Sequence, residues 1–387
     1  MPDFTGVSVV DNHCHPIDPG KKTLAPELLA KEFYHGLGDL PESGVSARSW
    51  KASDELRHHF PHMGVVQTAV CQLSRLLDCE AELEAVAAER NRRTEESFAN
   101  YASLLYRDAG IEATVLDSGL TSGDPALSLT PGRVLRLFQM GPALRTLLEQ
   151  SGSYKELLQS YQERLDRAVR VDGFVGVKSH LAEEVGFGRE PVSQPEAESA
   201  FPAAKAGNSE AYRTLYQAAF TTTLMQCQEL SIPVHVHTGI TGGLWDGPIA
   251  SADPFLLVPL IRRPEFIRTR IVLLHGAYPW IQHAGAVAHA LPHVWVDMSW
   301  TTPWISLRIG ECYREVIGMA PLSKLMVGSG GHGSPEIAWL AAKTAKIALR
   351  DALGEAVRLE LMTEKQAAQA GRMILYDNAA RLYGIEG

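Results

Sequence analysis

Short apolar runs recur along this chain with amphipathic stretches between them, and this alternation constrains the fold more than any other feature. The intervening stretches have helical spacing, for example Glu210 to Leu230, with Ser209 as its expected N-cap, and Gly285 to Leu291. Eight such runs predict a closed (β/α)8 TIM barrel, an α/β fold, with a doubly wound sheet as the alternative. The runs are Gly6 to Val10, Glu112 to Leu116, Arg133 to Phe138, Gly173 to Lys178, Pro233 to His237, Arg270 to His275, Val294 to Met298 and Lys324 to Val327.

Two stretches depart from the alternation. Lys21 to Asp108 is rich in Ala, Leu, Glu and Arg, with helical spacing in Glu80 to Tyr106, and is predicted to be a helical insertion after the first strand. Glu190 to Gly207, rich in Pro, Glu and Ala, is predicted to be a solvated loop. Pro335 to Leu353 and Thr363 to Tyr383 are expected to be closing helices. We therefore expect one barrel over residues 1–387, with residues 21–108 inserted in it.

Composition narrows the class of partner. The 387 residues carry a net charge of -9 without basic clusters, which argues against nucleic acid or an anionic membrane surface and favours a small-molecule substrate. Five scattered cysteines are expected to be reduced thiols. Without an apparent signal peptide or membrane-length apolar run, the expected location is cytoplasmic. Whether the chain forms a homo-oligomer is left open.

Histidines, with one lysine, stand at the ends of several of the predicted strands. His13 and His15 follow the first, Lys178 and His180 the fourth, His235 and His237 the fifth, and His275 the sixth. Active sites of such barrels lie at the carboxyl ends of the strands, and a two-residue spacing places both members of a pair on one face. Because neutral imidazoles bind borderline divalent metals such as zinc, the pattern predicts a shared metal site.

Six motifs give the chain a family resemblance that covers nearly its whole length. It resembles the amidohydrolase superfamily, within the amidohydrolase 2 branch, and is most similar to members like the N-terminal half of fused amidohydrolase and glutamine synthetase proteins. The motifs are Asp11-Asn12-His13-Cys14-His15-Pro16, Pro233 to Gly239, Leu274 to Trp280, Val296 to Ser299, Gly328 to Glu336 and Tyr376 to Gly384.

The resemblance implies roles for the strand-end residues. It makes His13, His15 and His237 metal ligands, most simply for zinc, and His275 either a further ligand or the group that polarises the substrate. Lys178 stands where binuclear members carry a carboxylated lysine. As an ordinary lysine it would instead bind a substrate carboxylate.

The remaining predicted contacts are with substrate. His235 is expected to hydrogen-bond a ligand or the substrate, with metal coordination equally open, and His180 to contact the substrate. Trp245, Tyr278 and Trp280 are expected to form an aromatic wall, with ordinary packing at the rim as the alternative.

One position departs from the family pattern. Relatives carry an aspartate at the end of strand eight that takes a proton from the attacking water, and this chain has Gly330 there. General-base catalysis of this kind contributes about 10²–10⁴-fold to a rate. Three explanations are open: an introduced substitution, which we favour, a barrel that no longer hydrolyses, or an enzyme that uses another group, with His332 nearby.

The expected activity is therefore metal-dependent hydrolysis of an amide or related C–N bond in a small, anionic molecule, impaired where Gly330 replaces the aspartate. The first alternative is a non-oxidative decarboxylase of the same branch. The second is a binding barrel without chemistry.

Overall fold

Eight parallel strands form one sheet in a computed structural model, which describes residues 2–33, 58–120, 123–240 and 249–385. Neighbours in the sheet follow chain order from β1 to β8. Backbone bonds from Asn12 N to Val327 O (3.0 Å) and from Gly330 N to His13 O (2.7 Å) join β1 to the end of β8. The predicted TIM barrel is confirmed. The strands are β1 (Val9–Cys14), β2 (Ile111–Asp117), β3 (Arg133–Gln139), β4 (Gly176–Ser179), β5 (Val234–Val236), β6 (Ile271–Leu273), β7 (Val294–Asp297) and β8 (Leu325–Met326).

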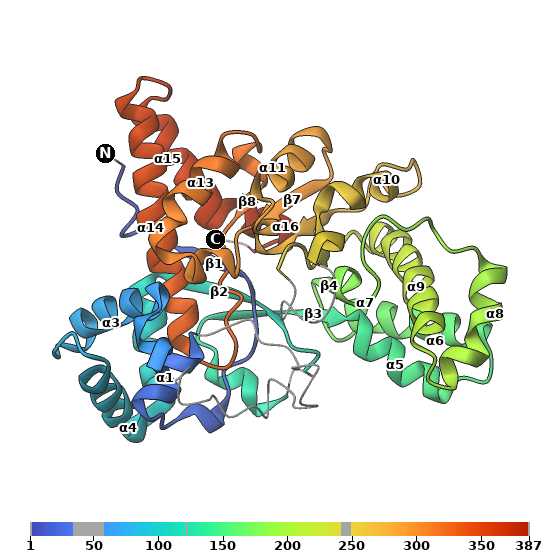
Figure 1. The fold of residues 1–387 in the computed structure, drawn as a ribbon, viewed down its shortest axis with the longest axis horizontal. Helices are drawn as coiled ribbons and strands as arrows, with labels where there is room; N and C mark the ends of the chain where they lie inside the picture. The colour runs from blue at the N-terminus through green and yellow to red at the C-terminus, as the bar shows by residue number, and fades with distance from the viewer. Residues whose placement is uncertain (1, 34–57, 121–122, 241–248, 386–387) are drawn as a thin grey trace.

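Helices surround the barrel, and those after β1 form a separate group in the lower left of Figure 1. This group, α1 (Pro26–Glu32), α3 (Gly64–Leu77) and α4 (Leu83–Ala109), agrees with the predicted helical insertion. The others are α5 (Met140–Gln150), α6 (Tyr154–Arg170), α7 (Leu181–Glu184), α8 (Gln194–Lys205), α9 (Ser209–Leu230), α10 (Val258–Ile261), α11 (Ile281–Ala290), α12 (Thr301–Trp304), α13 (Ile309–Ile317), α14 (Pro335–Arg358), α15 (Glu364–Arg372) and α16 (Asn378–Tyr383).

Two local predictions were wrong. The expected loop at Glu190 to Gly207 contains helix α8, because Ser193 and Glu196 form a capping box that starts a helix despite the proline content. The N-cap of α9 is Asn208 and not Ser209, since the Asn208 side chain accepts from Ala211 N at 2.9 Å.

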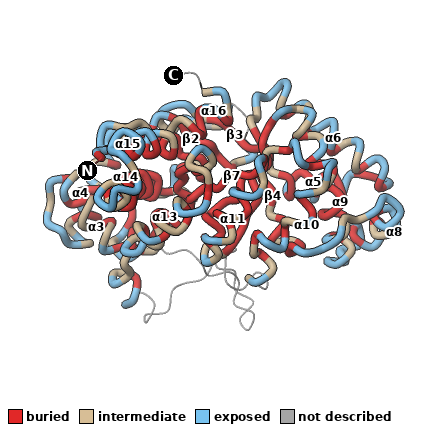
Figure 2. The backbone as a smooth tube through the Cα atoms, turned by 90° about the horizontal axis from the view of Figure 1, so that it is seen from above, coloured by how far each residue is buried: buried red, intermediate tan, exposed pale blue. Residues whose placement is uncertain are grey.

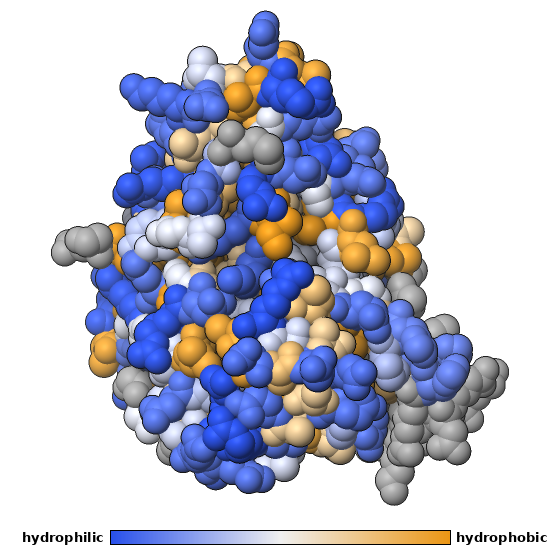
Figure 3. All heavy atoms as spheres, turned by 90° about the vertical axis from the view of Figure 1, so that its left-hand side faces the viewer, coloured by the Kyte–Doolittle hydropathy of each residue, from blue (hydrophilic) through white to orange (hydrophobic). Residues whose placement is uncertain are grey.

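The apolar core has two parts on either side of the strands. Most of it lies between the strands and the surrounding helices, where buried segments form the centre of Figure 2. A smaller cluster fills the barrel interior, built from Val10, Val115, Leu137 and Met326 among others, with Leu382 of α16 packed against it. The face in Figure 3 is mainly hydrophilic, with hydrophobic side chains in small separate groups. Within the described ranges, no helix is both long and apolar enough to cross a bilayer.

Candidate metal centre

The carboxyl ends of the strands bring several imidazoles into one cluster. The ring centroid of His13 lies 5.5 Å from that of His15, 6.1 Å from that of His235 and 5.4 Å from that of His275. The rings of His275 and His237 are 4.4 Å apart. The strand-end residues predicted from the sequence therefore converge on one end of the barrel.

His13 and His15 meet a carboxylate from β2. The candidate ligand atoms of His13, His15 and Asp117 all lie within 4.8 Å of one another. The Lys178 ammonium is 3.5 Å from both His13 Nε2 and Asp117 Oδ2. Burial alone would raise the pKa of Asp117, but the Lys178 charge acts together with His15, His180 and a hydrogen bond from Gln139 to hold the pKa below its usual value. Asp117 is therefore an ionised carboxylate at neutral pH.

This first group, His13, His15 and Asp117, fits a divalent cation. Burial lowers the pKa of His13 well below its usual value and also lowers that of His15, so both imidazoles are neutral and offer lone pairs. Within the described part of the chain, His13 Nδ1 and Asp117 Oδ2 are buried without a hydrogen-bond partner. Because buried polar atoms normally find partners, these atoms leave bonding capacity at the site.

A second group of possible ligands lies at the rim, formed by His180, Glu183 and His237, again with ligand atoms within 4.8 Å. Glu183 Oε1 is 3.6 Å from His237 Nδ1, and Glu183 Oε2 is 3.8 Å from His180 Nε2. His237 Nε2 donates to the Ile240 carbonyl at 2.8 Å. Burial, reinforced by the Lys178 charge, lowers the pKa of His237 to about 3 and that of His180 to about 4.

His235 lies beneath the cluster in a chain of hydrogen bonds to the C-terminal helix. Its Nε2 donates to the Tyr383 hydroxyl at 2.6 Å, and Tyr383 donates to Asn12 Oδ1 at 2.6 Å. The Asn12 amide donates in turn to Asp297 Oδ2 at 2.8 Å. These bonds hold His235 toward α16, so its predicted contact with substrate rests on Nδ1 alone.

His275 is held by a serine that follows β7 and by the carboxylate that ends this strand. His275 Nδ1 is 3.0 Å from Ser299 Oγ, and Ser299 donates its backbone N–H to Asp297 Oδ1 at 2.9 Å. The Ser299 hydroxyl also hydrogen-bonds Asp297, whose pKa burial raises to about 6. His275 adopts a left-handed backbone conformation (φ 66°), which is uncommon for a residue other than glycine and occurs frequently at functional sites.

Tyr278, one residue of the predicted aromatic wall, lies against aromatic side chains that were not predicted. Tyr278 packs against Trp300, with ring centroids 6.0 Å apart, and Trp300 stacks on Trp304 at 5.8 Å. Trp280 is half-buried at the start of α11. Trp245 lies outside the described residues. Their contacts with substrate stay a prediction.

Gly330 occupies a position shaped for glycine. Its backbone is left-handed (φ 62°), and a Cβ placed there would lie 2.9 Å from Trp300 N. An aspartate cannot replace it unless the backbone moves. Beside it, the His332 ring stacks on that of His15, with centroids 3.8 Å apart.

The structure divides the three predicted metal ligands between the two groups. His13 and His15 lie with Asp117, while His237 lies with His180 and Glu183. Neither carboxylate was predicted from the sequence. Asp117 directly follows a predicted apolar run, so its place at a strand end was a usable signal. Glu183 lies on α7, and no sequence signal indicated that it would face His237.

Part of the sequence matches a known protein family. The sequence model of the amidohydrolase family matches residues 159–385, more than half of the chain. Protein fluG of Emericella nidulans is 24% identical over 422 residues, which cover 97% of this chain and 46% of fluG. The chain thus spans about half the length of this curated relative.

Solved structures share the fold at low identity. A Lactobacillus casei protein described as a metal-dependent hydrolase superposes with a TM-score of 0.82 at 20% identity, covering 99% of this chain and 98% of the other. A uronate isomerase from Bacillus halodurans superposes with a TM-score of 0.66 at 13% identity, covering 99% of this chain and 94% of the other. At these identities the likeness concerns the fold alone.

Proposed function

The chain belongs to the amidohydrolase family, and we propose that it is a metal-dependent hydrolase that cleaves an amide or related C–N bond of a small, anionic molecule. The observation that carries this proposal is the meeting of His13, His15 and Asp117 beside Lys178 at the carboxyl end of the barrel. These three residues would hold a divalent metal, most simply zinc. When bound, such an ion acts as a Lewis acid and makes water a stronger nucleophile near neutral pH.

Lys178 would bind the negative charge of the substrate. Its side chain is 2% exposed, so its charge is little screened by water. The same ammonium contributes to lowering the pKa of five surrounding histidines, which keeps their rings neutral. A substrate carboxylate, or the oxygen of a polarised carbonyl, would therefore meet the Lys178 cation, which the Asp117 carboxylate also contacts, among neutral imidazoles.

His275 would supply the proton acceptor that Gly330 cannot. An ionised Asp297 only accepts hydrogen bonds, so the Ser299 hydroxyl donates to Asp297 and accepts from His275 Nδ1–H. When it is neutral, this ring carries its lone pair on Nε2. A positioned imidazole of this kind typically contributes about 10²–10⁴-fold to a rate.

A non-oxidative decarboxylase is the second candidate, and Gly330 is the observation that favours it. Loss of a carboxyl group needs no activated water, so the absent strand-eight carboxylate would cost such a reaction less than it would cost hydrolysis.

The test is a substrate panel on zinc-loaded protein. N-acyl amino acids and amides of dicarboxylic acids are assayed for released ammonia or amine, and the corresponding acids for carbon dioxide. Amine release that falls by about 100-fold or more in His275→Asn supports the hydrolase. Carbon dioxide release without amine release supports the decarboxylase, and binding without any turnover supports a barrel that only binds.

A further inference from the structure

His235 and the buried carboxylate of Asp297 are the two ends of one chain of hydrogen bonds. His235 Nε2 lies 2.6 Å from the Tyr383 hydroxyl, which donates to Asn12 Oδ1 at 2.6 Å. The Asn12 amide donates to Asp297 Oδ2 at 2.8 Å. The four side chains come from β5, α16, β1 and β7, so residues far apart in the sequence share this chain of bonds.

The carboxylate fixes the direction of each bond. Asp297 accepts through both oxygens, from Asn12 at Oδ2 and from the Ser299 backbone N–H at Oδ1. With its amide nitrogen directed at Asp297, Asn12 offers only its oxygen to Tyr383, and the single hydrogen of the hydroxyl points to that oxygen. The Tyr383 oxygen can then only accept from His235. The neutral His235 ring therefore carries its hydrogen on Nε2 and its lone pair on Nδ1.

The lone pair of His235 belongs to the site and not to the core. Nδ1 is buried and has no hydrogen-bond partner among the residues that the structure describes, so it leaves bonding capacity there. In the same part of the chain, neither group of converging metal-ligand atoms includes His235. Its Cα pairs in register with that of Lys178 on β4, so the two side chains point to the same face of the sheet.

His275 reaches the same carboxylate through a second arm. His275 Nδ1 is 3.0 Å from Ser299 Oγ, and the Ser299 hydroxyl hydrogen-bonds Asp297. Since Asp297 accepts, the hydroxyl donates to it and accepts from His275, whose neutral ring carries its lone pair on Nε2. The ring centroids of His235 and His275 lie 6.1 Å and 5.4 Å from that of His13. One carboxylate therefore connects two rings of the imidazole cluster.

We propose that Asp297 is a positioning residue that sets which nitrogen carries the hydrogen in both His235 and His275, and that Tyr383 of the closing helix α16 is the link to His235. Both neutral rings then accept hydrogen bonds at the site and do not donate to it, so among these side chains Lys178 is the donor to a substrate oxygen. The use of these groups in hydrolysis rests on the proposed function, whereas the tautomers depend on the chain alone.

The experiment is nitrogen NMR of the full chain with isotope-labelled histidine, near neutral pH, with and without Zn²⁺. The ring nitrogen that carries hydrogen and the one that does not have well-separated chemical shifts, and His235→Gln and His275→Asn assign the signals. We expect hydrogen on Nε2 of His235 and on Nδ1 of His275. Tyr383→Phe should change His235 alone, and Ser299→Ala should change His275 alone. Asp297→Asn should change at least one ring, because a carboxamide cannot accept through both of its terminal atoms.

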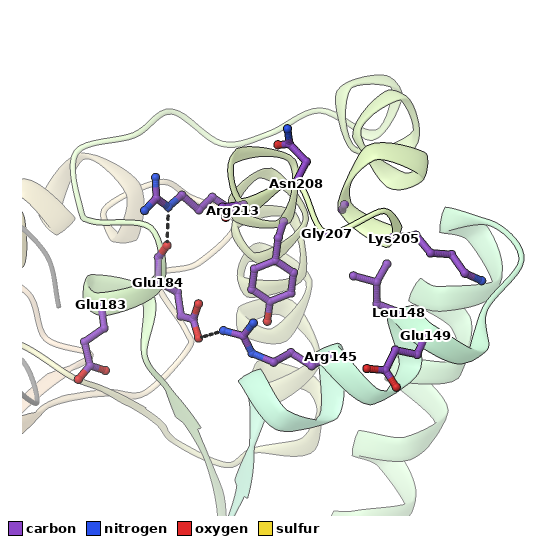
Figure 4. A pocket seen from close by; sticks show the side chains of 12 residues that line it. Arg145, Leu148, Glu149, Glu183, Glu184, Lys205, Gly207, Asn208 and Arg213 are labelled. Atoms are coloured by element: carbon purple, nitrogen blue, oxygen red, sulfur yellow. Dashed lines mark hydrogen bonds and ion pairs between the residues drawn. The ribbon is translucent and has the colours of Figure 1, made fainter. Parts of the chain in front are cut away.

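Two residues outside these bonds provide matched controls. Glu184 lines a cavity of about 500 Å³ between α5, α7 and α9, where Figure 4 shows its carboxylate reaching Arg145. Glu184→Gln makes the same carboxylate-to-amide change as Asp297→Asn and should leave both tautomers unchanged. Tyr376→Phe, at a half-buried tyrosine that packs against the barrel interior, is the control for Tyr383→Phe. Circular dichroism verifies folding, and the two single-arm variants suffice if Asp297→Asn does not fold.

The outcomes separate this inference from the proposed function. Hydrogen on Nδ1 of His235 in wild type overturns the inference, as does a folded Asp297→Asn chain in which both rings keep their wild-type shifts. Equal changes at His235 in Tyr376→Phe and Tyr383→Phe overturn the link through the hydroxyl. A chain that binds no zinc but keeps these tautomers contradicts the proposed function and supports the inference. On an amide that the substrate panel shows to be cleaved, Asp297→Asn should lower kcat by about 100-fold or more with little change in KM, and an unchanged kcat overturns the role in hydrolysis.

Discussion

The two ends of the barrel are built from the same strands with opposite chemistry. On β1, Val10 packs in the apolar interior and His13 joins the imidazole cluster. On β2, Val115 packs inward and Asp117 faces Lys178. Two or three residues along a strand thus separate a side chain that stabilises the barrel from one that binds ligands. Variants at the two ends should therefore affect different measurements.

The largest effect is expected at the polar end, from His15→Asn. Removing an imidazole ligand should weaken metal binding at the first group by more than about 100-fold, because even a residue that only supports a ligand typically contributes about 10–100-fold. Turnover should fall with it. Titration with Zn²⁺ under a competing chelator measures the change, and the exposed His289→Asn on α11 is the control. Equal zinc affinity in the two variants would show that His15 is not a ligand.

At the apolar end, Leu137→Ala should reduce the free energy of unfolding by about 2–5 kcal/mol and leave the metal stoichiometry unchanged. Leu137 is fully buried in the barrel interior, so truncation leaves a cavity. Urea unfolding measures the loss. Leu361→Ala, at a side chain that is 77% exposed, should have little effect. A Leu137→Ala chain that loses metal in proportion to its stability would mean that the two ends are not independent.

Gly330→Asp places a carboxylate at the polar end, next to His13 and Trp300. The left-handed backbone and the approach to Trp300 should cost about 1–3 kcal/mol of stability, with no gain in turnover. Gly330→Ala should cost a similar amount, because the strain comes from the Cβ. If Gly330→Asp is as stable as wild type and more active, the site retains the family geometry and the glycine is a loss of function.

The sequence predicted the fold and the basic residues of the site, but not its carboxylates, for one physical reason. Buried parallel strands need continuous apolar residues, so a histidine or lysine ending such a run stands out, as His13 and Lys178 do. Asp117 was missed although it ends β2 in the same way. Glu183 could not be found, because its approach to His237 depends on how α7 turns after β4.

Two further parts of the structure differ in whether a local pattern could have indicated them. The proline and glutamate content of α8 predicts a loop, although the spacing of Ser193 and Glu196 is a capping signal for a helix. The partner of His235 could not be predicted. Tyr383 lies 148 positions away and reaches the site only because α16 closes the barrel from below.

The smallest effect concerns His235, where the two regions meet. Burial, with the Lys178 charge adding to it, lowers the pKa of His235 to about 3, against 6.5 in an unfolded chain. Between these values the unfolded chain binds a proton that the folded chain does not, so the free energy of unfolding falls as the pH drops from 6.5 toward 3. One histidine contributes up to about 1.4 kcal/mol per pH unit. In metal-free protein, His235→Gln keeps a donor for Tyr383 and removes this proton uptake, so urea unfolding between about pH 7 and about pH 5 should show a shallower loss than in wild type. If the free energy of unfolding fell equally with pH in wild type and His235→Gln, His235 would have the same pKa in the folded and unfolded chains. Water would then reach its ring in the folded barrel, although α16 packs beneath it.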